Sequence, residues 1–360
     1  MILKNKLIII FSIVIAVLLL VFLLNEIDFL DQDENKNYDY SLLFCGDFMI
    51  GDAYYGPYDF PFENLSDIFE NQDEIIINLE SSITDYDQIE PINKSYLYKM
   101  DSDVIAELIK NNITICNLAN NHILDYGQIG FNDTISNLSF NNIDYFGAGF
   151  NESDSREGLI KQYGKLRVSY LGYFQDRAIY ENDYDFYSSS VKPGVARLNS
   201  TNLKSDIPRV KSKSDLVIIS FHMGTNYVTE INELTQTYAQ YAIDLGADAI
   251  IIHSPHIILP IELYKNKPIF YSLGNFIFTT PGRFSEVKDI YGNGLAVEFK
   301  IIDKNITNVL ITPFKTNNQV INFQPYILDS TKAQEVFNLI IPANVNYRIQ
   351  GSTANINLLN

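Results

Sequence analysis

From residue 41 onward, short apolar runs alternate with amphipathic segments, and many of the runs end in polar residues. Uninterrupted apolar runs of roughly four to eight residues are typical of strands that are buried on both faces of a sheet. The amphipathic segments at 128–138 and 234–245 predict helices that cover such a sheet. The pattern therefore indicates one layered domain of the α/β or α+β class. Its strands are expected in SLLFCGD, EIIINLE, ITICNLANNH, DYFGAG, RVSYLGYF, DLVIISFHMG and ADAIIIHSPH.

The pattern changes after IFYSLGNFIF, where apolar and polar residues begin to alternate, as in GLAVEFKII and NVLITPFK. Such alternation predicts strands with one exposed face. One more helix is expected at 332–341, and the Asn-rich residues 343–360 are expected to form a loosely packed tail. No linker or repeat divides this part of the chain, so we predict one domain over 41–325 and a C-terminal extension over 326–360.

Residues 7–24 form an unbroken apolar run. As a helix this run would be roughly 27 Å long, which is enough to cross a membrane. It is longer than the apolar part of a secretory signal, and no small-residue cleavage site follows it, so an uncleaved anchor is favoured over a cleaved signal. Lys4 and Lys6 precede the run and acidic residues follow it, which places residues 1–6 in the cytoplasm. We expect a single-pass protein of the cell membrane, with an acidic tether at 25–40 and the main domain outside the cell.

The charge balance bears on possible partners. The chain has 44 acidic and 26 basic side chains and a net charge of −18, so it should repel nucleic acid. The two cysteines, Cys45 and Cys116, lie in apolar runs. Two cysteines cannot form a disulfide framework, and we favour buried thiols over a disulfide bridge between them.

The four histidines of the chain all follow apolar runs, in short polar motifs. Two carboxylates, Asp47 and Glu80, stand at the ends of other predicted strands, with Gly46 allowing a sharp turn before Asp47. Because strand ends bring side chains to one edge of a sheet, these residues are expected to form one site. The histidines are His122, His222, His253 and His256.

Asn121 precedes His122, and Asp125 follows it by three residues. An asparagine beside a histidine can bind a metal with one side chain and transfer a proton with the other, and the aspartate can orient the imidazole. A mixed set of Asp, Glu, Asn and His ligands suits divalent Mn, Fe or Zn better than calcium. We expect one or two such ions.

Taken together and in order, the motifs resemble the CapA/PgsA-type capsule (poly-gamma-glutamate) synthesis proteins, whose domain is similar to the calcineurin-like metallophosphatases. The motifs that carry the resemblance are GDFMIGD, NLESSIT, NLANNHILDYGQIGFNDTI, FGAG, SFHMGTNY and GADAIIIHSPHIILPIELYKNKPIFYSLGNFIF.

The resemblance implies a four-layer αββα metallophosphatase-like sandwich with a site at the strand ends. It also implies that His122 is the proton donor and that six residues bind metal. The chain departs from metallophosphatases proper in lacking a histidine in the opening motif, and it carries Asn226 where the family usually has a glutamate. The implied metal ligands are Asp47, Glu80, Asn121, His222, His253 and His256.

The function expected from the resemblance is biosynthesis or export of a capsule or poly-gamma-glutamate-type surface polymer, by an anchored protein with a metal-dependent hydrolase-like or transferase-like site. Its expected partners are the lipid bilayer, an anionic surface polymer or its precursor, and membrane-bound polymer synthase subunits. Fold alone does not separate this from a non-catalytic scaffold or export accessory protein, or from a general extracellular phosphatase.

Overall fold

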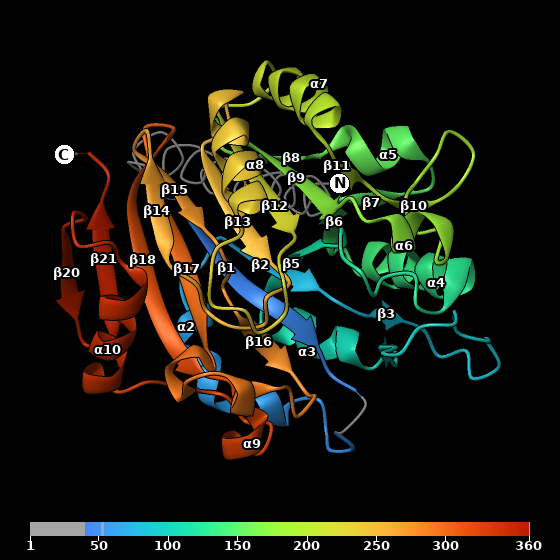
Figure 1. Ribbon diagram of the computed structural model, residues 1–360, viewed down its shortest axis with the longest axis horizontal. Coiled ribbons are helices and arrows are strands. Elements are labelled where there is room, and N and C mark those ends of the chain that lie inside the picture. The colour runs from blue at the N-terminus through green and yellow to red at the C-terminus, as the bar shows by residue number, and fades with distance from the viewer. Residues whose placement is uncertain (1–39, 52–53, 360) are drawn as a thin grey trace, which may run out of the picture. The chain divides into compact units, whose positions relative to one another are not determined.

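The computed structural model describes residues 40–51 and 54–359, and the segment from Tyr40 onward forms one compact unit (Figure 1). Its backbone is organised around two large sheets. In the first sheet, β1 pairs in parallel with β2 and β16 and antiparallel with β17. The order of the first sheet is β20 (Tyr347–Gln350), β21 (Thr353–Asn357), β18 (Asn305–Lys315), β17 (Asn293–Ile302), β1 (Tyr40–Met49), β2 (Glu74–Leu79), β5 (Ile113–Asn117) and β6 (Asp144–Phe146), with β16 (Asn275–Phe278) beside β1 and β19 (Tyr326–Ile327) beside β18.

The second sheet has seven strands, and its central strands β9, β12 and β13 are parallel. Two short pairs, β3 (Ser82–Ile83) with β4 (Lys99–Met100) and β7 (Ala148–Gly149) with β10 (Gly194–Val195), lie outside both large sheets. The order of the second sheet is β11 (Arg197–Leu198), β9 (Leu166–Gln175), β12 (Leu216–His222), β13 (Ala249–His253), β15 (Lys267–Phe270) and β14 (Ile261–Tyr264), with β8 (Leu159–Tyr163) beside β9.

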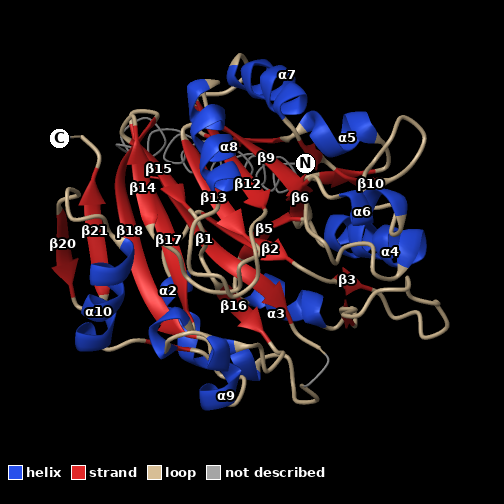
Figure 2. Cartoon of the chain, in the orientation of Figure 1, coloured by secondary structure: helices blue, strands red, loops and turns tan. Residues whose placement is uncertain are grey.

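The two sheets pack face to face through an apolar layer, in which Phe44 of β1 lies near Tyr170 of β9. Helices cover the outer faces. The predicted amphipathic helices are confirmed as α4 (Gly127–Phe140) and α8 (Glu233–Asp244). The first packs with α3 on the outer face of the first sheet, and the second packs with α7 over β12 and β13 (Figures 1 and 2). The expected mixed α/β class is thus confirmed, with helices outside two stacked sheets.

The other helical segments of the described residues include α3 and α7, named above, and several shorter ones. They are η1 (Phe60–Leu65), α2 (Ser66–Phe69), α3 (Val104–Lys110), α5 (Glu152–Glu157), α6 (Ala178–Asn182), α7 (Ser200–Lys211), η2 (Phe284–Glu286), η3 (Asp289–Tyr291), α9 (Asn318–Ile321) and α10 (Ser330–Ile340). The last of these, α10, corresponds to the helix expected near the C-terminus.

Two expectations need correction. The prediction of a loose tail at 343–360 is wrong, because β21 pairs with β18 and buries Ala354 and Ile356 against the core between the sheets. The first strand does not end in a turn at Gly46, because β1 continues to Met49 with an irregular register near Asp47. Few side chains of the tail are fully apolar. They alternate with polar residues over only a short stretch of an Asn-rich segment, so this strand pattern is easily missed.

Cys45 lies on β1 and Cys116 on β5, with β2 between these strands. Both are buried free thiols, as expected. Residues 7–24, the predicted anchor, lie outside the described residues. Within 40–51 and 54–359, none of the helices combines the length and the apolar character needed to span a bilayer.

Candidate metal centre

A row of polar residues crosses the first sheet at one level of its strands. Asp47 of β1 stands opposite Asn78 of β2 on one side and Asn275 of β16 on the other, and Asn78 stands opposite Asn117 of β5. All four side chains are buried. The Asn117 Nδ2 donates to Asn78 Oδ1 at 2.8 Å, and Asn78 Nδ2 donates to Asp47 Oδ1 at 2.8 Å. This chain of amides fixes the orientation of the Asp47 carboxylate.

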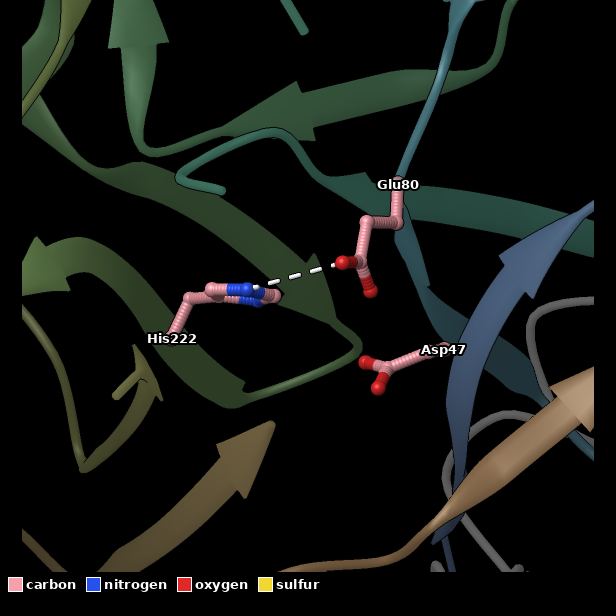
Figure 3. Close-up of side chains that lie close together, drawn as sticks. All are labelled: Asp47, Glu80 and His222. Carbon is pink, nitrogen blue, oxygen red and sulfur yellow. Dashed lines mark ion pairs between the residues drawn. The ribbon is translucent and has the colours of Figure 1, made fainter. Parts of the chain in front are cut away.

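The second sheet brings its own polar row to the same region. His222 and His253 are the last residues of β12 and β13 and are paired in register. The carboxyl ends of parallel strands are the usual place for a binding site in α/β proteins. The carboxylates of Asp47 and Glu80 and the ring of His222 point into the same space, as Figure 3 shows. One ligand atom from each of these three residues lies within 4.8 Å of the others.

Glu80, which directly follows β2, is the central residue of this cluster. Its Oε1 atom lies 3.7 Å from His222 Nε2, 3.9 Å from His256 Nε2 and 3.9 Å from His122 Nε2. These separations are too long for hydrogen bonds. Ligand atoms held at about 2.0–2.2 Å from one ion lie roughly 3–4 Å from one another, so the spacing suits a shared cation.

The end of β13 and the turn that follows it place His253 and His256 against Asp47. His253 Nδ1 lies 3.4 Å from Asp47 Oδ1, and His256 Nδ1 lies 3.3 Å from Asp47 Oδ2. Ser254 and His256 have φ of 101° and 59°, values that non-glycine residues rarely adopt. Such strain costs on the order of 1–3 kcal/mol per residue and is typical of functional sites. His256 Nδ1 is also 2.8 Å from Asn275 Oδ1, which fixes its ring.

His122 forms a second set of contacts at the edge of the cluster. Its Nδ1 atom lies 2.6 Å from Asp125 Oδ2, so that Nε2 is the nitrogen that faces Glu80. Lys94 reaches the same group: its Nζ is 2.8 Å from Asp125 Oδ1 and 3.1 Å from His122 Nδ1, and it donates to the backbone oxygen of Asn121. The ring of Tyr98 stacks on His122 with a centroid separation of 4.0 Å. The imidazole is therefore held on several sides.

The protonation of the cluster follows from burial and from the nearby charges. Burial alone would raise the pKa of the Asp47 carboxyl, but the adjacent His253 and His256 hold that pKa well below its usual range. Burial and the charge of Asp47 raise the pKa of Glu80 well above its usual range. Burial lowers the pKa of His222 well below its usual value, and lowers that of His122 to about 4 despite the attraction of Asp125. Both imidazoles are therefore neutral at pH 7, which is the form that binds metals.

Four buried polar atoms of the cluster and its surroundings have no hydrogen-bond partner among the described residues. Buried polar groups are normally paired, and leaving one unpaired costs about 1–3 kcal/mol. A divalent cation among Asp47, Glu80 and the histidines would satisfy their carboxylate and imidazole atoms together, so these residues fit a metal. The four atoms are Asp47 Oδ2, Glu80 Oε1, Asn121 Oδ1 and His253 Nδ1.

The structure thus brings Asp47, Glu80 and the four histidines together and places Asp125 behind His122. Sequence analysis missed several supporting residues. The amides of the polar row could have been suspected because asparagine is unusual inside apolar strand runs. Lys94 gave no such signal, because it lies in a polar loop far from the other motifs. The missed residues are Asn78, Asn117, Asn275, Lys94 and Tyr98.

Comparison with known proteins agrees with the resemblance in the motifs. Residues 41–280 match the model of the bacterial capsule synthesis protein family PGA_cap. The PGA biosynthesis protein CapA of Bacillus subtilis is 31% identical over 218 residues, which cover 60% of this chain and 56% of the relative. The capsule biosynthesis protein CapA of Bacillus anthracis is 29% identical over 255 residues, covering 68% and 61%. The chain thus spans less than two thirds of the length of these relatives.

A solved structure, the calcineurin-like phosphoesterase YfkN from Bacillus subtilis, is also similar, with a TM-score of 0.47, 14% identity and coverage of 83% of this chain and 97% of that one. The family model covers the strands that carry Asp47, Glu80, His222 and His253, and also the loops that carry His122 and His256. The chain belongs to the PGA_cap family of bacterial capsule synthesis proteins.

Proposed function

We propose that this chain is a membrane-anchored protein of capsule or poly-gamma-glutamate-type polymer assembly. In this proposal, its main domain lies outside the cell and contains a metal-dependent hydrolase-like or transferase-like site. The names of the relatives and of the family support a role in capsule or polymer assembly. The apolar segment at 7–24 and the charges around it support the anchor and its orientation.

The main observation that supports a metal site is the environment of Glu80 Oε1. This buried atom has no hydrogen-bond partner among the described residues, yet three imidazole Nε2 atoms surround it at 3.7–3.9 Å. A buried oxygen of a purely structural side chain would normally be hydrogen-bonded, and within the described part of the chain only the other oxygen of Glu80, Oε2, has such a contact, with Asn78 Nδ2 at 3.4 Å. We infer that Asp47, Glu80, Asn121, His222, His253 and His256 would hold one or two divalent Mn, Fe or Zn ions. Such an ion, when bound, polarises a carbonyl or phosphoryl oxygen and lowers the pKa of water.

The protein groups around the centre would handle the proton. His122 presents Nε2 towards Glu80, while Asp125 fixes its Nδ1. This arrangement suits an imidazole that exchanges a proton at Nε2 with a leaving group. Lys94 neutralises Asp125, and Tyr98 holds the ring in place. The residues therefore suit cleavage or transfer at an amide or phosphoester, with His122 and Asp125 as the proton-handling pair.

The test is metal content and turnover measured on the same protein. We expect at least one transition metal per chain, and cleavage of a γ-linked glutamate oligomer or a phosphodiester. His122→Ala should retain metal and fold, as judged by circular dichroism, but lose turnover by at least about a hundredfold. A metal-free protein, or a His122→Ala variant as active as the parent, would refute the catalytic proposal.

A second candidate is a non-catalytic accessory protein for polymer synthesis or export. One relative, 30% identical over 216 residues, is described as a probable polyglutamine synthesis accessory protein of Mycobacterium tuberculosis. This role would be favoured if the protein co-purifies with membrane-bound synthase subunits and shows no turnover. The anchor is tested separately: removal of residues 1–39 should move the protein from the membrane fraction to the soluble fraction.

A further inference from the structure

A cavity of about 530 Å³ adjoins the proposed metal centre, because His256 forms part of its wall. Its other walls are largely aromatic. Phe278 contacts both His256 and Tyr98, with ring centroids 5.0 and 5.4 Å apart, and Tyr98 in turn stacks on His122. The cavity and the centre therefore share His256, and Tyr98 connects the cavity wall to His122. Its volume falls within the usual range of ligand sites, roughly 300–1,000 Å³.

The charge of this cavity is opposite to that of the chain as a whole. The chain has a net charge of −18, yet the described residues that line the cavity include Arg283 and no aspartate or glutamate. An arginine guanidinium can bind a carboxylate or phosphate through two parallel hydrogen bonds, and it also stacks on aromatic faces. The cavity therefore offers a cationic group to an anionic ligand.

Arg283 is held in place but retains free donors. Its guanidinium lies over the ring of Tyr227, 4.9 Å from the centroid, and its Nη2 donates to the backbone oxygen of Asn226 at 3.2 Å. Its ion pair with Glu286, at 3.4 Å, is half exposed on both sides and therefore weak. The group has five N–H donors, and its contacts in the described part of the chain use Nη1 and Nη2 alone. A ligand can still bind it through two hydrogen bonds.

The wall that supports Arg283 is itself strained. Tyr227 has a φ of 61°, which costs a non-glycine residue on the order of 1–3 kcal/mol. Its backbone N–H donates to the Pro255 oxygen at 2.9 Å, in the turn that carries His256. Tyr227 therefore connects the position of the guanidinium to the position of a proposed metal ligand.

We propose that this cavity is a subsite for a second anionic group of the substrate. In this subsite, Arg283 binds the carboxylate of the substrate unit next to the one whose bond lies at the metal centre. The proposal rests on the function proposed above. It makes the substrate a chain of repeated carboxylates, in which one unit occupies the centre and the next occupies the cavity. A bound cation and Arg283 together then offset the repulsion between the acidic protein and its acidic substrate.

The experiment is equilibrium binding of a fluorescent γ-linked pentaglutamate to the metal-loaded full-length protein at low salt, with metal content measured on each sample. Arg283→Gln should weaken binding about tenfold, and Arg283→Lys should restore part of it. Asn226→Asp, an exposed substitution that places a carboxylate beside Arg283, should weaken binding to a similar extent. None of the three should change the metal content.

Two exposed positions near the C-terminus provide matched controls. Arg348→Gln and Asn346→Asp make the same changes in charge as Arg283→Gln and Asn226→Asp, but they lie on or beside the edge strand β20, outside the cavity. Both control variants should bind the pentaglutamate as the parent does. Three results would each overturn the carboxylate subsite while leaving the metal centre intact. The first is that Arg283→Gln binds the pentaglutamate as tightly as the parent does. The others are that the parent binds a γ-linked pentaglutamine, or a polyphosphate of equal charge, more tightly than it binds the pentaglutamate. A parent without metal would instead refute the proposed function.

Discussion

Glu80 and His222 belong to different sheets, yet Glu80 Oε1 lies 3.7 Å from His222 Nε2 in a fully buried cluster. The first residue follows β2 of the ten-stranded sheet, and the second ends β12 of the seven-stranded sheet. The packing of the two sheets is therefore what creates the centre. A change that shifts one sheet against the other should disturb metal binding even when it touches no ligand.

Gly46 is a position where the close approach of β1 and β16 beside Asp47 can be tested. A Cβ atom on Gly46 would lie 1.9 Å from the backbone oxygen of Gly274, so β16 could not approach β1 beside Asp47. We expect Gly46→Ala to lower the free energy of unfolding by more than about 3 kcal/mol, as measured by urea denaturation. Gly351→Ala is the control, because its Cβ would meet no atom within 4 Å and it should cost only about 1 kcal/mol for its φ of +59°.

The stability of the metal-free protein should depend on the pH through His122. Its pKa is about 4 in the folded protein and about 6.5 when unfolded, so the unfolded chain binds the proton more tightly. The stability that this residue contributes is complete above pH 6.5 and is lost as the pH falls towards 4, by on the order of 3 kcal/mol. Glu80, whose pKa is raised, contributes in the opposite sense. The difference between the parent and His122→Gln, measured by urea unfolding from pH 7 to pH 4.5, isolates the His122 contribution. A constant difference over that range would contradict the account.

Lys94 should matter mainly through Asp125. The Lys94 side chain is 8% exposed and the Asp125 side chain 0%, with 2.8 Å between Nζ and Oδ1. Removing one partner of a buried ion pair costs about 3–5 kcal/mol, because the other charge is left unpaired. Lys94→Met should show such a loss in thermal or urea unfolding. The double variant Lys94→Met with Asp125→Asn should be more stable than Lys94→Met alone, whereas additive losses would show that the pair is not coupled.

The C-terminal strand should contribute to the stability of the core. Ile356 of β21 is 1% exposed, whereas the next residue, Asn357, is exposed. We expect Ile356→Asp to lower the free energy of unfolding by about 3 kcal/mol or more, because it buries an unpaired carboxylate. Asn357→Asp should change it by less than about 0.5 kcal/mol. Equal effects of the two substitutions would mean that β21 does not pack as described.

Most of the fold and much of the centre could be predicted from the sequence, for identifiable reasons. Buried strands and covering helices have strong periodic signals, and His222 and His253 stand directly at strand ends, where convergence can be expected. The packing of the tail was not predicted because the alternation of Ala354 and Ile356 with polar residues is short and lies in an Asn-rich segment. Lys94 could not be found, because nothing local in the sequence indicates that its polar loop folds back onto Asp125.

The supporting amides illustrate the same limit. Asn78 and Asn117 lie within strands whose other residues are apolar, and only the register between β2 and β5 brings them into one hydrogen-bonded row with Asp47. Because β2 and β5 are buried on both faces, their apolar pattern specifies the register between them only weakly. The sequence could therefore mark these two asparagines as unusual, but their pairing with Asp47 required the structure.

The central claim is that Glu80 and its neighbours form a metal centre, and the most direct test is elemental analysis of the purified protein together with its Glu80→Gln variant. Glu74→Gln is the matched control, since Glu74 is a buried glutamate at the opposite end of the same strand. We predict at least one Mn, Fe or Zn ion per chain in the parent and in Glu74→Gln, and a loss of most of it in Glu80→Gln while the fold is retained. A parent that contains no transition metal after expression in metal-replete medium, or a Glu80→Gln variant that keeps the full metal content, would contradict the account.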